Sequence, residues 1–378
     1  MPRWDVTFDV RLDVASPDVV TAVARAEALA RVIRDVPITP DVQRKLDRLN
    51  ILRAVRGTTG IEGAELTEDE VDLIMSTPPG ERVLPASRER EEKEARNAEE
   101  VMSFVAEEIE PDRPLSEQLI KDIHNLTTRG IDYPGNRPGH YRAGPVRAGT
   151  YLAPDADAVP RLMQEFIEWF HEGPPRGWPP AIQAIVAHFY VISIHPFQDG
   201  NGRTSRAVES FLLFRGGINA RGFYSLANFY YRRRQEYEDM LDYVRFETNG
   251  DLTPFLRFAL NGLVEELEEV HAEVLHEVRL MAFRDYSREV IFSAASADQA
   301  ARMYSLVLGL GRETVPVAVL RRGGHPLYGL YRSYSSRTLR RDLDLLSAEG
   351  LIVIENREIR ANLDVMTQFA APAPPTSS

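Results

Sequence analysis

The spacing of apolar residues along this chain is typical of α-helices over most of its length. Helical spacing runs through Pro17–Ile33, Asp41–Val55 and Ala158–His171. Thr67 and Glu70 have the spacing of a capping box, which marks the start of a further short helix. The pattern therefore predicts a mainly α protein.

The middle of the chain predicts helices of two kinds. Between Glu91 and Arg129 the spacing predicts two helices, interrupted at Pro111 and Pro114 because proline breaks a helix. Residues 181–194 are nearly all apolar, which favours a helix buried on every side; a buried strand is the alternative. Helical spacing resumes over residues 203–214.

A few segments depart from the helical pattern. Trp4–Asp13 alternates apolar and polar residues, which predicts a short strand. Pro134–Pro154 is rich in Gly and Pro and predicts a loop that contains a hairpin. Near the C-terminus, Leu351–Ile354 and Glu358–Arg360 predict two strands.

These elements divide the chain into regions. We expect an N-terminal helical region (1–87), a central core (88–260), a connecting helix (261–290), a C-terminal domain (291–366) and a disordered tail (367–378). Within the C-terminal domain, expected helices at 298–310, 313–321 and 335–346 precede the two strands. That order resembles a winged helix-turn-helix.

Composition narrows the class of protein. The net charge of −12 argues against general coating of nucleic acid or membrane, although a local basic patch is compatible with it. The chain has no Cys, which excludes disulfides and thiolate sites. No stretch has the roughly 20 consecutive apolar residues of a membrane span, and the N-terminus lacks the apolar core of a signal peptide. We therefore expect a cytoplasmic protein.

Residues 195–206 (HPFQDGNGRTSR) concentrate the reactive chemistry of the chain. His195 can take a proton near pH 7, and Asp199 supplies a hard oxygen for Mg²⁺. The glycine-rich turn before a helix exposes backbone N–H groups that bind anions. Arg203 and Arg206 lie on one face of that helix and can donate to phosphate oxygens. The segment predicts a site that transfers a phosphate-containing group.

This segment resembles the signature of the Fic family, and every defined position of that signature is matched. The resemblance implies a helical Fic fold with a β-hairpin flap and an enzyme that moves AMP from ATP to a Ser, Thr or Tyr hydroxyl of a target protein. It implies roles for seven residues of the segment. His195 would be the general base, Asp199 the Mg²⁺ ligand, and Gly200, Asn201, Gly202, Arg203 and Arg206 the phosphate-binding residues.

Thr58–Gly63 (TTGIEG) fits the inhibitory pattern found in many Fic proteins. By that resemblance Glu62 would pair with Arg206 and withhold it from the γ-phosphate of ATP. The alternative is that Glu62 and Gly63 only end a helix.

Two further segments have candidate roles by the same resemblance. Residues 141–153 resemble the flap over the active site, which would pair with an extended segment of the target; the alternative is a plain surface hairpin. Tyr231 and Tyr237 fall where relatives often place aromatic residues near adenine; the alternative is that they belong to the core.

Several functions remain open at this level. The leading interpretation is a Mg²⁺-dependent protein adenylyltransferase with built-in inhibition, acting on other proteins or on itself. One alternative is a DNA-binding regulator with a Fic sensor domain, and another is removal of AMP by the same site. Arg337, Arg340 and Arg341 could contact DNA, or the C-terminal domain could dock a protein or hold a homodimer.

Overall fold

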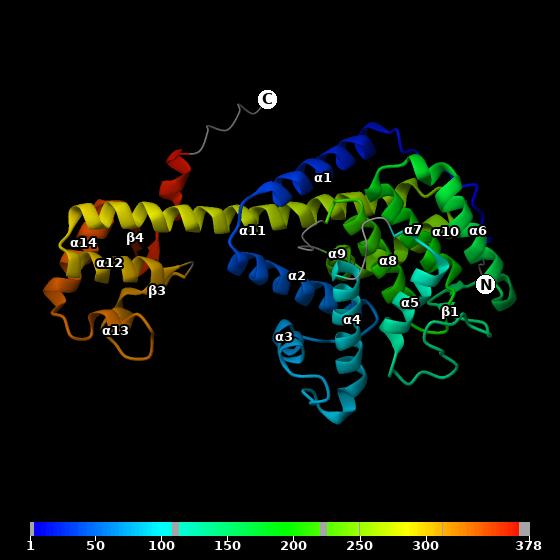
Figure 1. The fold of residues 1–378 in the computed structure, drawn as a ribbon, viewed down its shortest axis with the longest axis horizontal. Helices are drawn as coiled ribbons and strands as arrows, with labels where there is room; N and C mark the ends of the chain where they lie inside the picture. Colours follow the sequence, from blue (N-terminus) through cyan, green and yellow to red (C-terminus); the bar gives the residue numbers. More distant parts are fainter. Residues whose placement is uncertain (1–3, 108–112, 220–224, 249, 312, 370–378) are drawn as a thin grey trace. The chain divides into compact units, whose positions relative to one another are not determined.

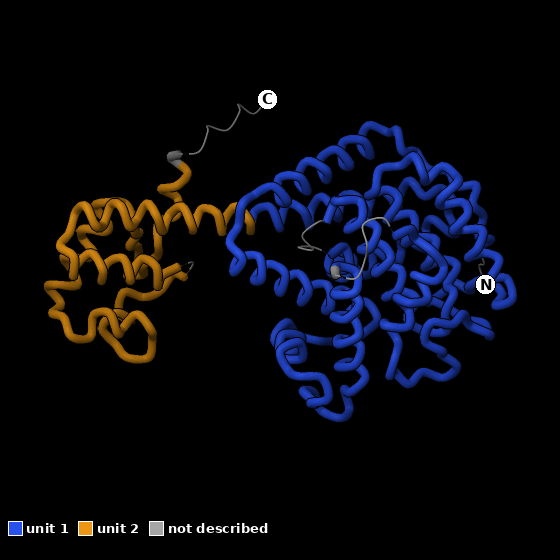
Figure 2. The backbone as a smooth tube through the Cα atoms, viewed as in Figure 1, with its two compact units in different colours: residues 1–272 blue, residues 273–378 orange. Residues whose placement is uncertain are grey.

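The chain divides into two compact units, residues 1–272 and 273–378 (Figure 2). The computed structural model describes residues 4–107, 113–219, 225–248, 250–311 and 313–369. The boundary between the units falls within one long helix, α11 (Thr253–Ala294). The connecting helix predicted at 261–290 is therefore present and extends beyond both expected ends.

The first unit is built almost entirely of helices (Figure 1). They are α1 (Pro17–Asp35), α2 (Pro40–Ile61), α3 (Glu68–Ser76), α4 (Glu89–Glu107), α5 (Glu117–Thr128), α6 (Val159–Glu172), α7 (Pro180–Ile194), α8 (Asn201–Arg215), α9 (Leu226–Arg232), α10 (Arg234–Phe246) and the first part of α11. The capping box of Thr67 and Glu70 begins α3 as predicted. The mainly α class is confirmed.

Helices α7 and α8 form the buried pair on which the site depends. Of residues 181–194, all but Gln183 are buried, which confirms a helix surrounded on every side. Helix α8 packs against α7 and is buried from Asn201 to Leu213. Because α4 and α5 also pack against α8, the turn between α7 and α8 is held within the unit.

The strand predicted at Trp4–Asp13 is wrong. The only backbone pairing of the described part of this segment is an isolated bridge between Arg11 and Asp251. The alternating apolar residues instead insert side chains between helices: the ring of Phe8 stacks on Tyr190 of α7. The alternation of apolar and polar residues thus indicated correctly that one side of the segment is buried, but it did not indicate hydrogen bonds to a partner strand.

The hairpin predicted within Pro134–Pro154 is confirmed. Strands β1 (Arg147–Ala148) and β2 (Tyr151–Leu152) pair antiparallel, with Gly149 in the turn at a φ of 56°.

The second unit combines helices with a small antiparallel sheet. After the second part of α11 come α12 (Ala297–Leu310), β3 (Val315–Pro316), α13 (Tyr328–Tyr331), α14 (Ser336–Ala348), β4 (Ile352–Glu355) and β5 (Glu358–Ala361), and the sheet order is β3-β5-β4. The helix predicted at 313–321 is wrong: Val315 and Pro316 pair with β5, and only a short 3₁₀ turn follows (Val317–Leu320). A run of β-branched residues around a proline favours this edge strand.

The order of elements agrees with a winged helix-turn-helix, an interpretation that stays a prediction. The predicted disordered tail lies outside the described residues from residue 370 onward, while Leu363–Phe369 forms a 3₁₀ helix. None of the described helices is long and apolar enough to cross a membrane.

Candidate active site

His195 directly follows the last residue of α7. It adopts a left-handed backbone conformation (φ 53°, ψ 57°), which is uncommon for a residue with a side chain and marks a constrained position. Its ring Nδ1 lies 3.1 Å from the carbonyl oxygen of Ile192, to which it donates when the ring is neutral. That bond leaves Nε2 with a free lone pair, as a general base requires.

The surroundings of His195 keep its ring neutral. The residue is only 8% exposed. Burial, together with the nearby charges of Arg245 and Arg142, lowers the pKa of His195 to about 4. The imidazole is therefore unprotonated at neutral pH.

The turn from His195 to Gly200 is braced on both sides. On one side, the side chain of Asn201, the first residue of α8, accepts a hydrogen bond from the backbone N–H of Phe197 and donates one to the Phe197 carbonyl, both at 2.8 Å. From outside, the His124 ring stacks on the Phe197 ring with centroids 3.7 Å apart. His124 also donates from Nε2 to the Asp199 carbonyl at 3.0 Å and accepts from the backbone N–H of Gly139.

Arg142 braces the same turn at its other end. Its Nε donates to the His195 carbonyl at 2.8 Å, and its backbone N–H donates to the Pro196 carbonyl at 3.0 Å. His124 and Arg142 together fix both ends of the turn relative to α5 and the flap.

The N-terminus of α8 has the features that favour anion binding. Gly200 is its N-cap at a φ of 76°, where glycine is favoured, and no side chain caps the helix. The side chains of Arg203 and Arg206 are buried in the first turns. Among the described residues, none accepts a hydrogen bond from the buried Nε of Arg203. Free amides, a helix dipole and two buried cations favour a polyanion here.

Asp199 lies beside these cations and lines the cleft. Its Oδ2 is 3.3 Å from Arg203 Nη2 and 3.4 Å from Arg90 Nη2. The other terminal nitrogen of Arg203, Nη1, lies 3.2 Å from Glu94 Oε1. The described residues contain no group of three or more His, Cys, Asp or Glu that could hold a metal ion. One cleft-lining carboxylate fits a Mg²⁺ ion that arrives with a polyphosphate, because Mg²⁺ then needs few protein ligands.

Arg206 is paired with the segment that resembles an inhibitor. Its Nη2 donates to Glu62 Oε1 at 2.7 Å and to the Thr58 carbonyl at 3.0 Å, and its Nε donates to Thr58 Oγ1 at 3.0 Å. Burial opposes ionisation of Glu62, but Arg206 and Arg203 hold the pKa of Glu62 below its usual range. A third of the Glu62 side chain remains exposed to the cleft. The pair is charged at neutral pH.

Two glycines allow the helix that carries Glu62 to approach the core. Glu62 follows the last residue of α2. A Cβ at Gly57 would come within 2.8 Å of the backbone carbonyl of Ala227 on α9, and one at Gly60 would overlap the ring of Tyr231. Gly63, at a φ of 101°, ends this segment, so the helix-end interpretation of Glu62 and Gly63 and the pairing with Arg206 are both true.

The two tyrosines proposed for adenine lie in different places. Tyr237 is buried, lines the cleft, stacks on Tyr230 and hydrogen-bonds to His188 and Arg206. Tyr231 packs against Gly60 and is not among the residues that line the cleft. Their role at adenine stays a prediction.

The cleft above His195 has a volume of about 550 Å³. The flap contributes residues 146–150 to it, and α10 contributes one face that includes Leu241 and Arg245. Thr150 donates to Asp242 at 2.7 Å, which ties the flap to α10. Arg245 lies over the Tyr151 ring at 4.1 Å and donates to Ser193 Oγ, two residues before His195.

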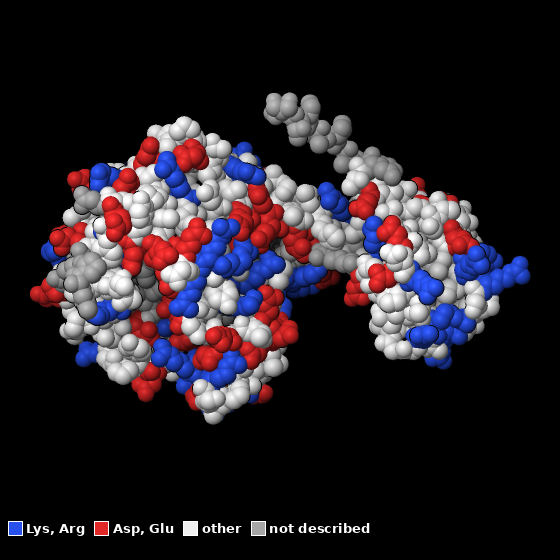
Figure 3. All heavy atoms as spheres, turned by 180° about the vertical axis from the view of Figure 1, so that it is seen from behind, with Lys and Arg blue, Asp and Glu red and all other residues white. Residues whose placement is uncertain are grey.

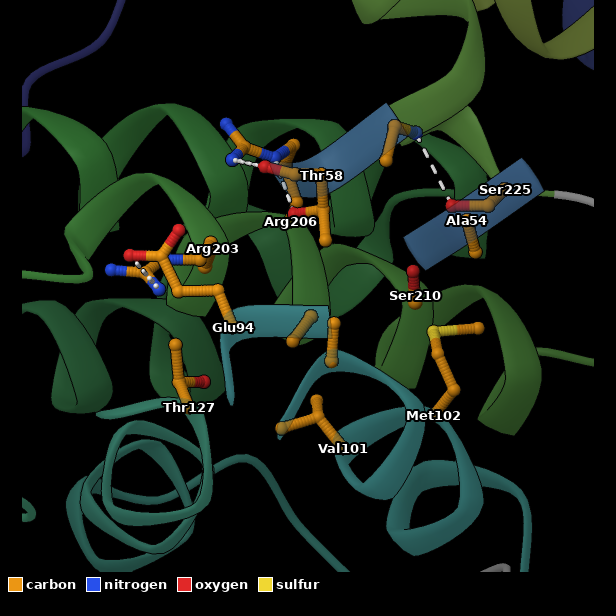
Figure 4. A pocket seen from close by; sticks show the side chains of 13 residues that line it. Ala54, Thr58, Glu94, Val101, Met102, Thr127, Arg203, Arg206, Ser210 and Ser225 are labelled. Atoms are coloured by element: carbon orange, nitrogen blue, oxygen red, sulfur yellow. Dashed lines mark hydrogen bonds and ion pairs between the residues drawn. The ribbon is translucent and has the colours of Figure 1, made fainter. Parts of the chain in front are cut away.

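A second, smaller cavity lies next to Arg206 (Figure 4). It has a volume of about 30 Å³, room for little more than ordered water. Its wall is mainly apolar, with Ala54 and Thr58 from α2 facing Val101 and Met102 from α4. The segment that carries Thr58 and Glu62 is therefore not fully packed against the core behind Thr58.

Sequence reasoning missed several residues that shape the site. A mixed-charge run such as residues 88–94 is typical of a solvated helix face, yet Glu92 and Glu94 within it are buried, and Glu94 pairs with Arg203. His124, Arg142 and Arg245 carried no distinguishing pattern. The role of each becomes visible only in its contacts with residues that are distant in the sequence.

Comparison with known proteins supports the family. Residues 114–213 match the Fic/DOC family model. A protein adenylyltransferase Fic from Drosophila ananassae is 27% identical over 53% of this chain and 38% of its own length, and one from Aedes aegypti is 30% identical over 43% and 32%. The chain thus spans about a third of the length of these two curated relatives.

A solved structure extends the likeness of fold beyond that segment. A Fic family protein from Desulfovibrio desulfuricans matches with a TM-score of 0.57 at 22% identity, over 96% of this chain and 98% of its own. The turn that carries His195 and Arg206 lies inside the segment that the family model matches. Residues 114–213 are therefore a Fic/DOC domain, and the chain that contains them has a Fic fold.

Proposed function

We propose that this protein transfers AMP from ATP to a hydroxyl of a target protein. The observation that carries the proposal is the neutral, buried His195 beside a helix N-terminus that holds two buried arginines. The family match and the names of the curated relatives support the same activity.

The chemistry follows from the positions of these groups. His195 Nε2 takes the proton as a Ser, Thr or Tyr oxygen bonds to the α-phosphorus, and the bond from that phosphorus to pyrophosphate breaks. The α8 amides, Arg203 and Arg206 hold the phosphates and stabilise their charge. The edge of the flap positions the target segment.

Asp199 is the residue that would hold Mg²⁺. When bound, the ion would neutralise charge on the polyphosphate. The Asp199 carboxylate would exchange its contacts with Arg203 and Arg90 for this role.

Glu62 would inhibit the enzyme in its resting state. The carboxylate occupies the hydrogen-bonding edge of Arg206 that a γ-phosphate would use. Charge-assisted pairs of this kind compete effectively with phosphate.

A cytoplasmic location, self-modification and a homodimer stay predictions.

The proposal is tested by labelling in host lysate with ATP that carries the label on either the α- or the γ-phosphate. The Glu62→Gly variant should label proteins from α-labelled ATP only, and Glu62→Gly/His195→Ala should not. Mass spectrometry of the labelled band would then identify the target and the modified residue. Label from the γ-phosphate would indicate a kinase and contradict the proposal, and faster release of AMP from a modified target than transfer to it would indicate the reverse activity.

A further inference from the structure

The second unit contains an arginine-rich segment without acidic residues. Between Thr314 and Arg341 the chain has six arginines and no Asp or Glu, although the net charge of the whole protein is −12. Such a local reversal of charge produces a positive surface even on an acidic protein.

Helix α14 presents three of these arginines on its outer face. With about 3.6 residues per turn, Arg337, Arg340 and Arg341 lie on one side of the helix. The opposite side is the buried one and consists of Leu339, Asp342, Leu343 and Leu346. The side chains of Arg340 and Arg341 are 85% and 66% exposed. The helix is thus anchored by its apolar side and directs its arginines outward.

The acidic residues of α14 reduce this charge less than the sequence suggests. Asp342 is fully buried, pairs with Arg302 at 2.7 Å and accepts from Gln299 at 2.9 Å. Its charge is therefore neutralised inside the unit. Asp344 is the one acidic side chain that α14 exposes.

Further arginines surround the start of α14. Arg321 donates to the carbonyl oxygen of Tyr334 at 2.6 Å, which places its guanidinium beside the N-cap Ser335. Arg332, also exposed, precedes this cap by three residues. Figure 3 shows Lys and Arg gathered on part of the surface of this unit. The dipole of α14 adds positive potential at the same end.

We propose that α14 and the arginines at its start bind double-stranded DNA. An exposed helix fits the major groove of B-DNA, which is about 12 Å wide. The outer arginines would contact phosphates or base edges, and the flanking hydroxyls of Ser336 and Thr338 would donate to phosphates. Glu355 and Glu358 flank the turn of the β4–β5 hairpin, so the hairpin contributes little to the contact.

Other anionic partners fit this surface less well. The deep, narrow major groove of A-form RNA does not admit a helix. Membrane-surface helices place large apolar residues beside their basic ones, whereas the leucines at 339, 343 and 346 are buried in the core of this unit and Leu345 packs partly against it.

The test uses the full-length protein and a fluorescent DNA duplex of random sequence. We expect binding with a Kd of about 10⁻⁴ to 10⁻⁶ M near physiological salt that weakens steeply as salt rises. The triple variant R337A/R340A/R341A should bind at least about tenfold more weakly, with a salt slope smaller by roughly three. Asp344→Asn should bind more tightly.

A matched control removes the same charge elsewhere. R25A/R44A/R161A replaces three exposed arginines of the first unit and should bind like the wild type. Circular dichroism must show that both triple variants are folded. Absence of binding by the wild type, equal loss in both triple variants, or tighter binding to duplex RNA or to anionic vesicles would overturn the proposal.

Discussion

The carboxylate of Glu62 occupies the position that a Cβ at Gly202 would take, so any side chain at position 202 would collide with it. Gly202 belongs to the first turn of α8, whose amides form the anion-binding position. Glu62 therefore places a carboxylate beside the amides and on the arginine that a polyphosphate would need. We therefore expect Glu62 and a nucleotide to compete for this position.

Removal of the Glu62 carboxylate should tighten ATP binding. A charge-assisted hydrogen bond contributes about 1.5–3 kcal/mol, and the lower end applies because a third of Glu62 is exposed. Glu62→Gly should therefore bind ATP about tenfold more tightly or better, measured by calorimetry. Glu65→Gly, which removes a nearby exposed carboxylate, should leave the affinity unchanged; an equal gain in both variants would show a general charge effect instead.

The residues that could be identified from the sequence are those that lie close together along it. Residues 195–206 form one continuous segment, so the order of residue types along it was sufficient to identify them. Glu62 was identified because a second short pattern accompanied the first. His124 and Glu94 reach the turn from α5 and α4, and no local pattern distinguishes them from a core histidine or a surface glutamate.

Helices were predicted more reliably than strands for a physical reason. The backbone hydrogen bonds of helix α7 lie within the helix itself, so a sufficiently long apolar run was enough to predict it. A strand depends on a partner far away in the sequence: Trp4–Asp13 lacks one, and Val315–Pro316 has one in β5. The first was predicted as a strand and the second as a helix, because the presence or absence of a distant partner strand cannot be recognised locally.

The low pKa of His195 has a consequence for the pH dependence of activity. Because burial lowers that pKa to about 4, the ring is already neutral well below its usual range. We expect kcat/KM for AMP transfer by the Glu62→Gly variant to stay level from about pH 5.5 to pH 8. The negative charge of Glu62 raises the pKa of His195, so its loss in this variant lowers that pKa further. The acidic limb of the pH profile then moves to still lower pH. A limb centred near pH 6.5 would show an exposed, ordinary histidine.

His124 should act as a positioning residue. Its ring supports Phe197 and Asp199 on one side of the turn without lining the cleft. His124→Ala should lower kcat by about tenfold to a hundredfold, because a small displacement of His195 is costly, while ATP affinity changes little. His140→Ala replaces an exposed neighbour whose ring contacts the carbonyl oxygen of Pro138, and it should have no effect. A loss confined to ATP affinity would assign His124 to nucleotide binding.

Glu266 should make stability depend on pH. Burial, opposed by Arg232, raises the pKa of Glu266 from 4.5 to about 7. The folded state then keeps a proton that the unfolded state loses, so its free energy of unfolding falls as pH rises from 4.5 to 7. Relative to the wild type, Glu266→Gln should gain up to about 3 kcal/mol between pH 4.5 and pH 8, measured by urea unfolding. Glu265→Gln, at a partly exposed position that also pairs with Arg232, should show no such gain.

Gly57 should control the inhibitory segment without touching the cleft. A Cβ at this position meets the backbone of Ala227 at 2.8 Å, and backbone cannot rotate away as a side chain can. Gly57→Ala must therefore displace α2 from α9, and Glu62 follows α2 directly. We expect more AMP transfer from labelled ATP although Glu62 is intact. Gly63→Ala is the control: a Cβ there meets nothing within 4 Å, so it should strain only the helix end. If Gly57→Ala is folded but no more active than the wild type, close approach of α2 to α9 is not what holds Glu62 on Arg206.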